Sequence, residues 1–219
     1  MERNHLSLDI PIRSFFRFAV DCPHRETAPV IDGALSDWNE AYRIPNLAAL
    51  DGQEEFAEFF ASWNVDGLYF AVDVKKAPAL EIQPDRPLRG DGLQIWVDTR
   101  DVRDAHRGSR YCHHFYVLPG KGGKKTVGGQ VRLRRARAHS KLCQPEELQV
   151  ACRSKRNGYS LEVHLPTSVL TGFDPEENNR LGFTYILRDR KLGRQYWTAD
   201  EPLPVSYDPS LWGTLVLSQ

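Results

Sequence analysis

The chain has 219 residues, of which 41% are hydrophobic and 26% charged, a composition typical of a water-soluble globular domain. Lys plus Arg and Asp plus Glu both total 29, and this balance argues against a chain whose whole surface binds nucleic acid or anionic membrane. No stretch approaches the roughly 20 apolar residues of a membrane helix, so we expect no membrane partner.

Residues 1–27 lack the apolar core and cleavage site of a secretory signal. We expect them to form an N-terminal extension, or a first strand packed on a main domain over 28–219. From this sequence we expect a cytoplasmic protein. The protein would be extracytoplasmic only if the given N-terminus were incomplete. The four cysteines form no CxxC pair and are predicted to be mostly buried thiols. They are Cys22, Cys112, Cys143 and Cys152.

Alternation of apolar and polar residues predicts strands along most of the chain. Two aromatic and β-branched runs, 59–63 and 68–72, are separated by Asn64-Val65-Asp66-Gly67, which indicates a β-hairpin. Further strands are expected at 93–98, 111–118, 131–134, 148–153 and 160–165, with a flexible connection at 120–129. Short helical turns are expected only at 35–40 and 167–170.

The 16 glycines and 14 prolines interrupt these runs at short intervals, which favours many short strands. We therefore predict an all-β fold, a two-sheet antiparallel β-sandwich of the jelly-roll or immunoglobulin-like type with at most short helical turns. The sequence shows no internal repeat that would indicate a second domain.

Charge is unevenly distributed, because residues 121–156 hold eleven Lys and Arg but only two Glu. The simplest interpretation is the solvated face of two strands and their loops, neutralised by acidic residues elsewhere in the chain. An anion-binding surface that uses Arg132, Arg134 and Arg137 to hold an anionic polymer or protein partner is the alternative.

Catalytic signatures are absent from the sequence, which has no GxSxG, HExxH or Walker spacing. Asp91 and Asp98 bracket a predicted strand, so their carboxyl groups would lie roughly 23 Å apart, too far for a glycosidase pair. We predict that the protein is not an enzyme.

Metal and haem sites have weak support, and no cofactor is expected to be required. Cys112 and His114 share one strand face, but two ligands do not complete a site, and we expect a partly buried Cys beside surface histidines. Asp98 and Asp101 offer oxygens at a spacing that suits calcium, as an alternative to an ordinary Asx-rich turn. Met1 is the only methionine, which excludes a Met-ligated haem, and no haem is expected.

Several short motifs follow one another along the chain. They are PVIDG at 29–33 with Trp38 downstream, SW at 62–63, GDGLQIWVD at 90–98, GYSLEVHLP at 158–166, LGFT at 181–184, YW at 196–197 and WGTL at 212–215. Over about 28–219 they resemble a family 9 carbohydrate-binding module. The resemblance implies a β-sandwich of the DOMON-like group, whose members bind sugars or, in other branches, haem.

Members of this family bind the end of a sugar chain between two aromatic side chains on loops, above polar residues from the sheet. Here the resemblance places Leu88-Arg89 at one clamp position and Ser206, next to Tyr207, at the other. Tryptophans at 38, 63 and 197 are expected in the core, whereas Trp96 should project from the opposite face, either stacking on a ligand or covered by a loop. The implied carbohydrate-binding residues are Arg89, Gln94, Trp96, His114, Tyr116 and Tyr207.

The predicted function is a non-catalytic carbohydrate-binding module whose partner is a sugar or polysaccharide end. Two alternatives stay open. Leu88 and Ser206 at the clamp positions favour a structural or protein-interaction sandwich that has lost the sugar site, and the basic segment 121–156 favours an anion-binding module.

Overall fold

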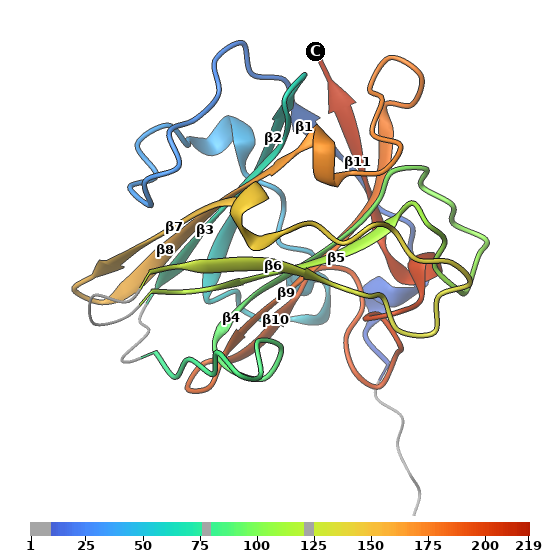
Figure 1. Cartoon of the computed structure of the whole chain (residues 1–219). Helices are drawn as coiled ribbons and strands as arrows, with labels where there is room; N and C mark the ends of the chain where they lie inside the picture. Colours follow the sequence, from blue (N-terminus) through green and yellow to red (C-terminus); the bar gives the residue numbers. More distant parts are fainter. Residues whose placement is uncertain (1–9, 76–79, 121–124) are drawn as a thin grey trace, which may run out of the picture.

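The computed structural model describes residues 10–75, 80–120 and 125–219 and shows two packed β-sheets (Figure 1). The seven-stranded sheet has the order β1-β11-β9-β4-β5-β6, with β10 paired to β9, and the four-stranded sheet has the order β2-β3-β8-β7. The strands are β1 Ala19–Pro23, β2 Ala57–Asn64, β3 Gly67–Lys75, β4 Gly92–Asp98, β5 Cys112–Leu118, β6 Val127–Val131, β7 Gln149–Lys155, β8 Gly158–Pro166, β9 Arg180–Asp189, β10 Gly193–Tyr196 and β11 Gly213–Ser218.

Helical structure in the described part of the chain consists of short 3-10 turns alone, which confirms the predicted all-β sandwich. No helix there is long and apolar enough to cross a bilayer. The turns are η1 Ile12–Phe15, η2 Glu40–Tyr42, η3 Leu47–Asp51, η4 Pro145–Glu147, η5 Thr167–Val169 and η6 Pro209–Leu211.

The main core lies between the two sheets and is built from the strand faces that alternation predicts. Leu93, Ile95 and Val97 on β4 pack in the same buried cluster as Leu161 and Val163 on β8. Because side chains alternate across a strand, the intervening residues of β4 must lie on the outer face of the large sheet. The implied carbohydrate-binding residues on β4 and β5 therefore lie on this outer face.

The predicted hairpin is confirmed, with β2 and β3 paired antiparallel up to Asn64 opposite Gly67. At the other edge, β1 pairs with β11 in parallel. The other pairs of named strands are antiparallel, and an isolated parallel bridge joins His24 to Trp63. The strands β1 and β11 are far apart in sequence, and no tight turn forces them to run in opposite directions. The described N-terminal segment is also anchored by Arg13, which is 1% exposed and pairs with Asp51 and Asp200.

Two local predictions are wrong. The strand expected at 131–134 ends at Val131, because β6 occupies 127–131 and the chain then turns, with Arg135 at φ +55°. The helical turn expected at 35–40 lies instead at η2, where the Asn39 side chain accepts a hydrogen bond from the Ala41 N–H at 2.9 Å. The turn at η5 is confirmed. In the predicted 120–129 connection, residues 121–124 lie outside the described residues.

Candidate functional site

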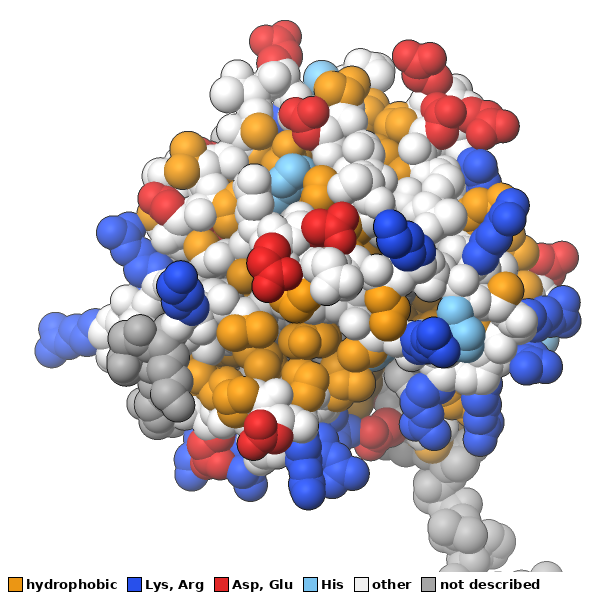
Figure 2. All heavy atoms as spheres, in the orientation of Figure 1, with side chains coloured by type: hydrophobic (Ala, Val, Ile, Leu, Met, Phe, Trp, Pro, Cys, Tyr) orange, Lys and Arg blue, Asp and Glu red, His pale blue; other side chains and the backbone are white. Residues whose placement is uncertain are grey.

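Outward-facing side chains of four neighbouring strands form a row across the large sheet. We call it the sugar row because it contains Gln94 and Tyr116, two of the carbohydrate-binding residues that the resemblance implies. Gln94 on β4 lies opposite Tyr116 on β5 and opposite Ile186 on β9, and Ile186 lies opposite Tyr196 on β10. Tyr116 and Tyr196 are half-buried. In Figure 2 hydrophobic side chains gather below β6, over β4, β9 and β10, with both acidic and basic side chains around them.

The neighbouring row is covered by loops. Trp96 is 0% exposed and packs in a second buried cluster with Leu133 and Trp212, which come from loops and from the segment before β11. Of the two alternatives for Trp96, the structure shows the covered one, so its indole is not available to a ligand. The loops could not be placed from the sequence because they carry no periodicity.

His114 supports Gln94 from below the surface. Its ring stacks on Trp96 with the centroids 4.2 Å apart, and its Nε2 lies 3.1 Å from Gln94 Oε1. Burial lowers the pKa of His114 to about 3, so the imidazole is neutral and donates to the amide oxygen, which can only accept. The amide group of Gln94 is therefore oriented by a buried residue.

Tyr116 lies against the backbone of β6 because residue 129 is glycine. A Cβ at Gly129 would lie 2.4 Å from the Tyr116 hydroxyl oxygen and 2.5 Å from Cζ, far closer than packed atoms allow. The glycine lets the ring cross the edge strand and stay in the sugar row beside Gln94.

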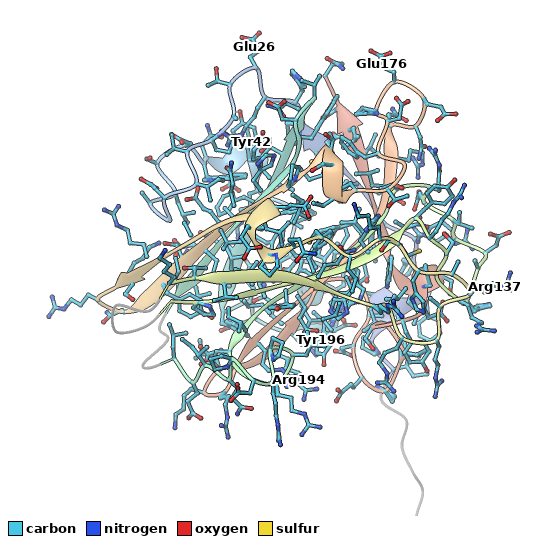
Figure 3. All side chains as sticks on the ribbon, in the orientation of Figure 1. Glu26, Tyr42, Arg137, Glu176, Arg194 and Tyr196 are labelled. Atoms are coloured by element: carbon cyan, nitrogen blue, oxygen red, sulfur yellow. The ribbon has the colours of Figure 1, made fainter. Side chains whose placement is uncertain are left out.

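A cleft of about 620 Å³ adjoins the sugar row, and we call it the arginine cleft. Arg188 and Arg194 lie opposite each other on β9 and β10, each two residues from Ile186 or Tyr196 and so on the same face. Figure 3 shows Arg194 and Tyr196 close together at this end of the sheet. The cleft is lined by Gln83, Arg86, Leu88, Arg89, Arg188, Arg190 and Arg194.

Two arginines of the cleft are paired with acids. Arg190 Nη1 lies 2.5 Å from Glu81 Oε2, and Arg194 pairs with Glu201. Arg188 is half-buried and donates to the Arg89 carbonyl at 3.3 Å. The pKa of Arg188 is lowered, first by burial and then by the nearby cations, of which Arg194 acts more strongly than Arg89.

The second clamp position of the resemblance lies elsewhere. The Tyr207 hydroxyl accepts a hydrogen bond from Arg135 Nη1 at 2.8 Å, and the Arg135 guanidinium lies 4.7 Å from the ring centroid. The structure shows no hydrogen bond or ring contact that joins Tyr207 to Gln94 or Tyr116. It therefore brings together Gln94, Tyr116 and His114, with Arg89 on the adjoining cleft, and associates Tyr207 with the basic segment.

The calcium candidates already have partners. Asp98 accepts backbone N–H groups of Arg100 at 3.1 Å and Val102 at 2.9 Å. Asp101 accepts the Thr214 hydroxyl at 2.8 Å and pairs with Arg103 at 3.7 Å. Nowhere in residues 10–75, 80–120 and 125–219 do three or more His, Cys, Asp or Glu side chains gather in a way that could hold a metal.

The thiols and histidines near β5 are structural. His113 and His114 are buried, so the expectation of surface histidines beside Cys112 is wrong. His114 is buried under the loops that cover Trp96, whereas His113 lies on the core-facing side of β5, opposite Val97. All four cysteines are free, with Cys22 and Cys112 buried.

The basic segment forms an exposed loop over 132–141, which we call the basic loop. Arg132, Arg134 and Arg137 are exposed. None of these three arginines, nor Arg135, forms an ion pair with an acid in the described part of the chain. Within the same basic segment, Lys155 pairs with Asp73 at 2.7 Å, so an ion pair with an acid elsewhere among the described residues is present at that residue and not at these four arginines. Figure 3 places Arg137 at the edge of the molecule, away from Arg194.

Comparison with known proteins agrees with this architecture. The family described as carbohydrate family 9 binding domain-like matches residues 31–219. The chain belongs to this family. No curated protein matches the sequence.

Solved structures similar to the chain include a family 9 carbohydrate-binding module from Caldicellulosiruptor kristjanssonii in complex with glucose. It is 17% identical, with a TM-score of 0.61, covering 93% of this chain and 96% of that one. The same kind of module in complex with cellotriose has 18% identity and a TM-score of 0.60, covering 93% and 94%. A protein from Bacteroides uniformis has 12% identity and a TM-score of 0.55, covering 92% and 99%.

The candidate residues on β9 and β10 were not predicted from the sequence. Arg188, Arg194 and Tyr196 come together only through the β9–β10 pairing. A signal existed, because Arg188 and Arg194 flank a short Gly-containing turn between two alternating runs. This pattern does not by itself indicate a binding site, because charged residues near a turn ordinarily indicate a solvated hairpin end.

Proposed function

We propose that the protein is a non-catalytic carbohydrate-binding module that binds a sugar in the sugar row. The observation that carries the proposal is the half-buried Tyr116 ring, held across Gly129 beside the oriented amide of Gln94. Family membership supports it, as do the similar modules whose structures contain glucose and cellotriose.

The chemistry of the row suits a pyranose. A sugar ring has an apolar C–H face, which packs on an aromatic ring, and hydroxyl groups, which need planar polar partners. Tyr116 and Tyr196 supply the aromatic surface. Gln94 Oε1 is engaged by His114, which leaves its amide NH₂ group to donate to a hydroxyl.

The carboxylates at the ends of β4 support the non-catalytic part of the proposal. Asp91 accepts the backbone N–H groups of Glu81 and Arg190, and Asp98 accepts those of Arg100 and Val102. Both carboxylates therefore serve to fix loops. A glycosidase needs two carboxyl groups facing one scissile bond.

A glycan array followed by calorimetric titration tests this function. We expect binding to a sugar or oligosaccharide, and we expect Tyr116→Ala to weaken it by about 1 to 3 kcal/mol with nearly unchanged Tm. Tyr207→Ala is the comparison, because its ring contacts Arg135. Absence of any binding on the array, or full affinity in Tyr116→Ala, would refute the assignment.

A second candidate function is binding of an anionic polymer by the basic loop. The observation that favours it is the set of exposed arginines without acid partners among the described residues. Retention on heparin should then fall steeply with salt, because neutralised anionic groups release counterions. Replacing Arg132, Arg134 and Arg137 by Ser should flatten that dependence, and elution of the unchanged protein at low salt would dismiss this function.

A further inference from the structure

The arginine cleft is continuous with the sugar row. Arg188 follows Ile186 by two residues on the same face of β9, a step of about 7 Å along a strand. Gln94 and Ile186 are only 8% and 7% exposed, so a sugar would contact this end of the row at the half-buried Tyr196, whose hydroxyl accepts a hydrogen bond from Arg194 Nη1 of the cleft at 3.2 Å. The cleft therefore lies within one sugar unit of a ring on Tyr196. The volume of about 620 Å³ is within the range of ligand sites.

The charge of the cleft is unbalanced. Its lining contains five arginines and no carboxylate. Glu81 and Glu201 neutralise two of them, Arg190 and Arg194, whereas Arg86, Arg89 and Arg188 have no acid partner in the described part of the chain. The arginines come from two segments, a loop at 83–89 and the β9–β10 hairpin. Like charges brought together in this way repel one another unless an anion lies between them.

Arg188 differs from the other shielded arginines of this protein. Arg13 is paired with two carboxylates, and the Arg25 guanidinium lies 3.7 Å from the Tyr42 ring centroid and 4.5 Å from that of Trp38. Arg188 has neither a carboxylate at ion-pair distance nor a ring against its guanidinium in the described part of the chain. Its Nη1 donates to the Arg89 carbonyl, and its Nε is unpartnered, as are those of Arg13, Arg25 and Arg103. A guanidinium with unused donors is suited to bidentate binding of a carboxylate or sulfate.

We propose that the arginine cleft binds the anionic group of an acidic sugar through Arg188 and Arg89, while the sugar ring lies on Tyr116 and Gln94. The inference rests on the proposed function and specifies its ligand class. A carboxylate and a sulfate on the sugar share the chemistry that the cleft recognises, and the probes below distinguish the two.

The test compares three tetramers by calorimetry: cellotetraose, the β-1,4-linked tetramer of glucuronic acid, and 6-O-sulfated cellotetraose. We expect at least one acidic tetramer to bind about ten-fold or more tightly than cellotetraose at low salt. We also expect the preference to shrink as salt rises, since ion pairs at an open cleft are screened. The acidic tetramer that binds more tightly identifies the anionic group.

The variants assign the preference to the cleft. Arg89→Gln and Arg188→Gln should each reduce the ratio of acidic-tetramer affinity to cellotetraose affinity several-fold. Arg17→Gln, at an exposed arginine outside both basic surfaces, should leave that ratio unchanged. Arg89 is exposed, so Arg89→Gln tests the inference even if Arg188→Gln does not fold.

Three results would overturn the inference. The first is equal affinity for the three tetramers, which leaves the proposed function standing. The second is a preference that survives both Gln variants and disappears when Arg132, Arg134 and Arg137 become Ser, because the anion site would then be the basic loop. The third is no binding of any tetramer, and a glycan array without any hit would then refute the proposed function as well.

Discussion

Gly129 decides at the scale of one residue whether Tyr116 can lie in the sugar row. In Gly129→Ala the new methyl group would overlap the outer end of the Tyr116 side chain, which can rotate away at modest cost. We therefore expect sugar affinity to fall by about 1 to 3 kcal/mol, as in Tyr116→Ala, with little change in the midpoint of urea unfolding.

Val127→Ala is the matched control for Gly129→Ala, because Val127 is an exposed residue of the same strand. It should bind sugar as the unchanged protein does. Full sugar affinity in Gly129→Ala would show that the Tyr116 ring position does not matter for binding.

His114 makes the stability of the protein depend on pH. Burial lowers its pKa to about 3, whereas the unfolded chain binds the proton near pH 6.5. The stabilisation from the neutral ring is therefore complete above about pH 6.5 and is lost as pH falls toward the folded pKa. Between pH 7 and 4.5 this loss amounts to about 2 to 3 kcal/mol for one histidine.

The measurement is urea unfolding at pH 7 and pH 4.5 for the unchanged protein and for His114→Asn. Acidic groups with raised pKa, such as Asp98 and Glu162, contribute in the opposite direction, but they are present in both proteins and cancel. The variant should lose about 2 to 3 kcal/mol less between the two pH values. Equal losses would indicate that His114 titrates normally.

At the scale of elements, Glu162 on β8 fixes the long segment between β1 and β2. Its carboxylate accepts the Trp38 indole N–H at 2.7 Å and the backbone N–H groups of Asp32 at 3.0 Å and Gly33 at 2.5 Å. Tyr42, labelled in Figure 3, stacks on Arg25 within the same segment. Glu162 therefore joins three groups of the segment to the small sheet, in addition to the hydrogen bonds from the Arg25 N–H to the Trp63 carbonyl and from the Ile44 N–H to the Phe59 carbonyl.

Glu162→Ala should lower the free energy of unfolding by about 2 to 4 kcal/mol, because it leaves buried donors without an acceptor. Glu162→Gln keeps one oxygen and should lose less. Urea unfolding measures both, with Glu26→Ala at an exposed position as the control. A loss below about 0.5 kcal/mol in Glu162→Ala would contradict the stabilising role of Glu162 in this segment.

Elements defined by local pattern could be predicted from the sequence. The β2–β3 hairpin follows from two apolar runs around Asp66-Gly67, and the core face of β4 follows from Leu93, Ile95 and Val97. The strand β6 could not be placed correctly, because Gly128 and Gly129 have low strand propensity. Both glycines lie in close contact with neighbouring side chains, Val150 and Tyr116. The parallel β1–β11 pair depends on contacts across nearly the whole chain.

The candidate site could be predicted only in part. Gln94 and Tyr116 were found through the family resemblance, and strand alternation places both of them on the outer face. Trp96 and His114 also face outward, but the loops that bury them have no periodic pattern. Arg188 and Arg194 required the β9–β10 register, and their closeness to Arg89 required the tertiary fold.

At the scale of the whole molecule, the formal net charge is zero, but the surface has two separate basic regions, the arginine cleft and the basic loop. The arginine cleft lies at the β9–β10 end of the large sheet, and the basic loop lies at the edge marked by Arg137 in Figure 3. An anionic ligand could bind at either surface. The cleft lies two residues along β9 and β10 from the sugar row, and Leu133 of the basic loop packs in the same buried cluster as Ile186 of the row. The location of binding is therefore the property that separates the competing functions.

An NMR titration of the ¹⁵N-labelled protein, with the glycan that binds most tightly on an array, tests the central claim most directly. The account predicts chemical-shift changes concentrated at Gln94, Tyr116, Gly129 and Tyr196 and on the adjoining cleft, with the small sheet unaffected. Changes confined to the basic loop, or to any surface that excludes Tyr116 and Gln94, would contradict it.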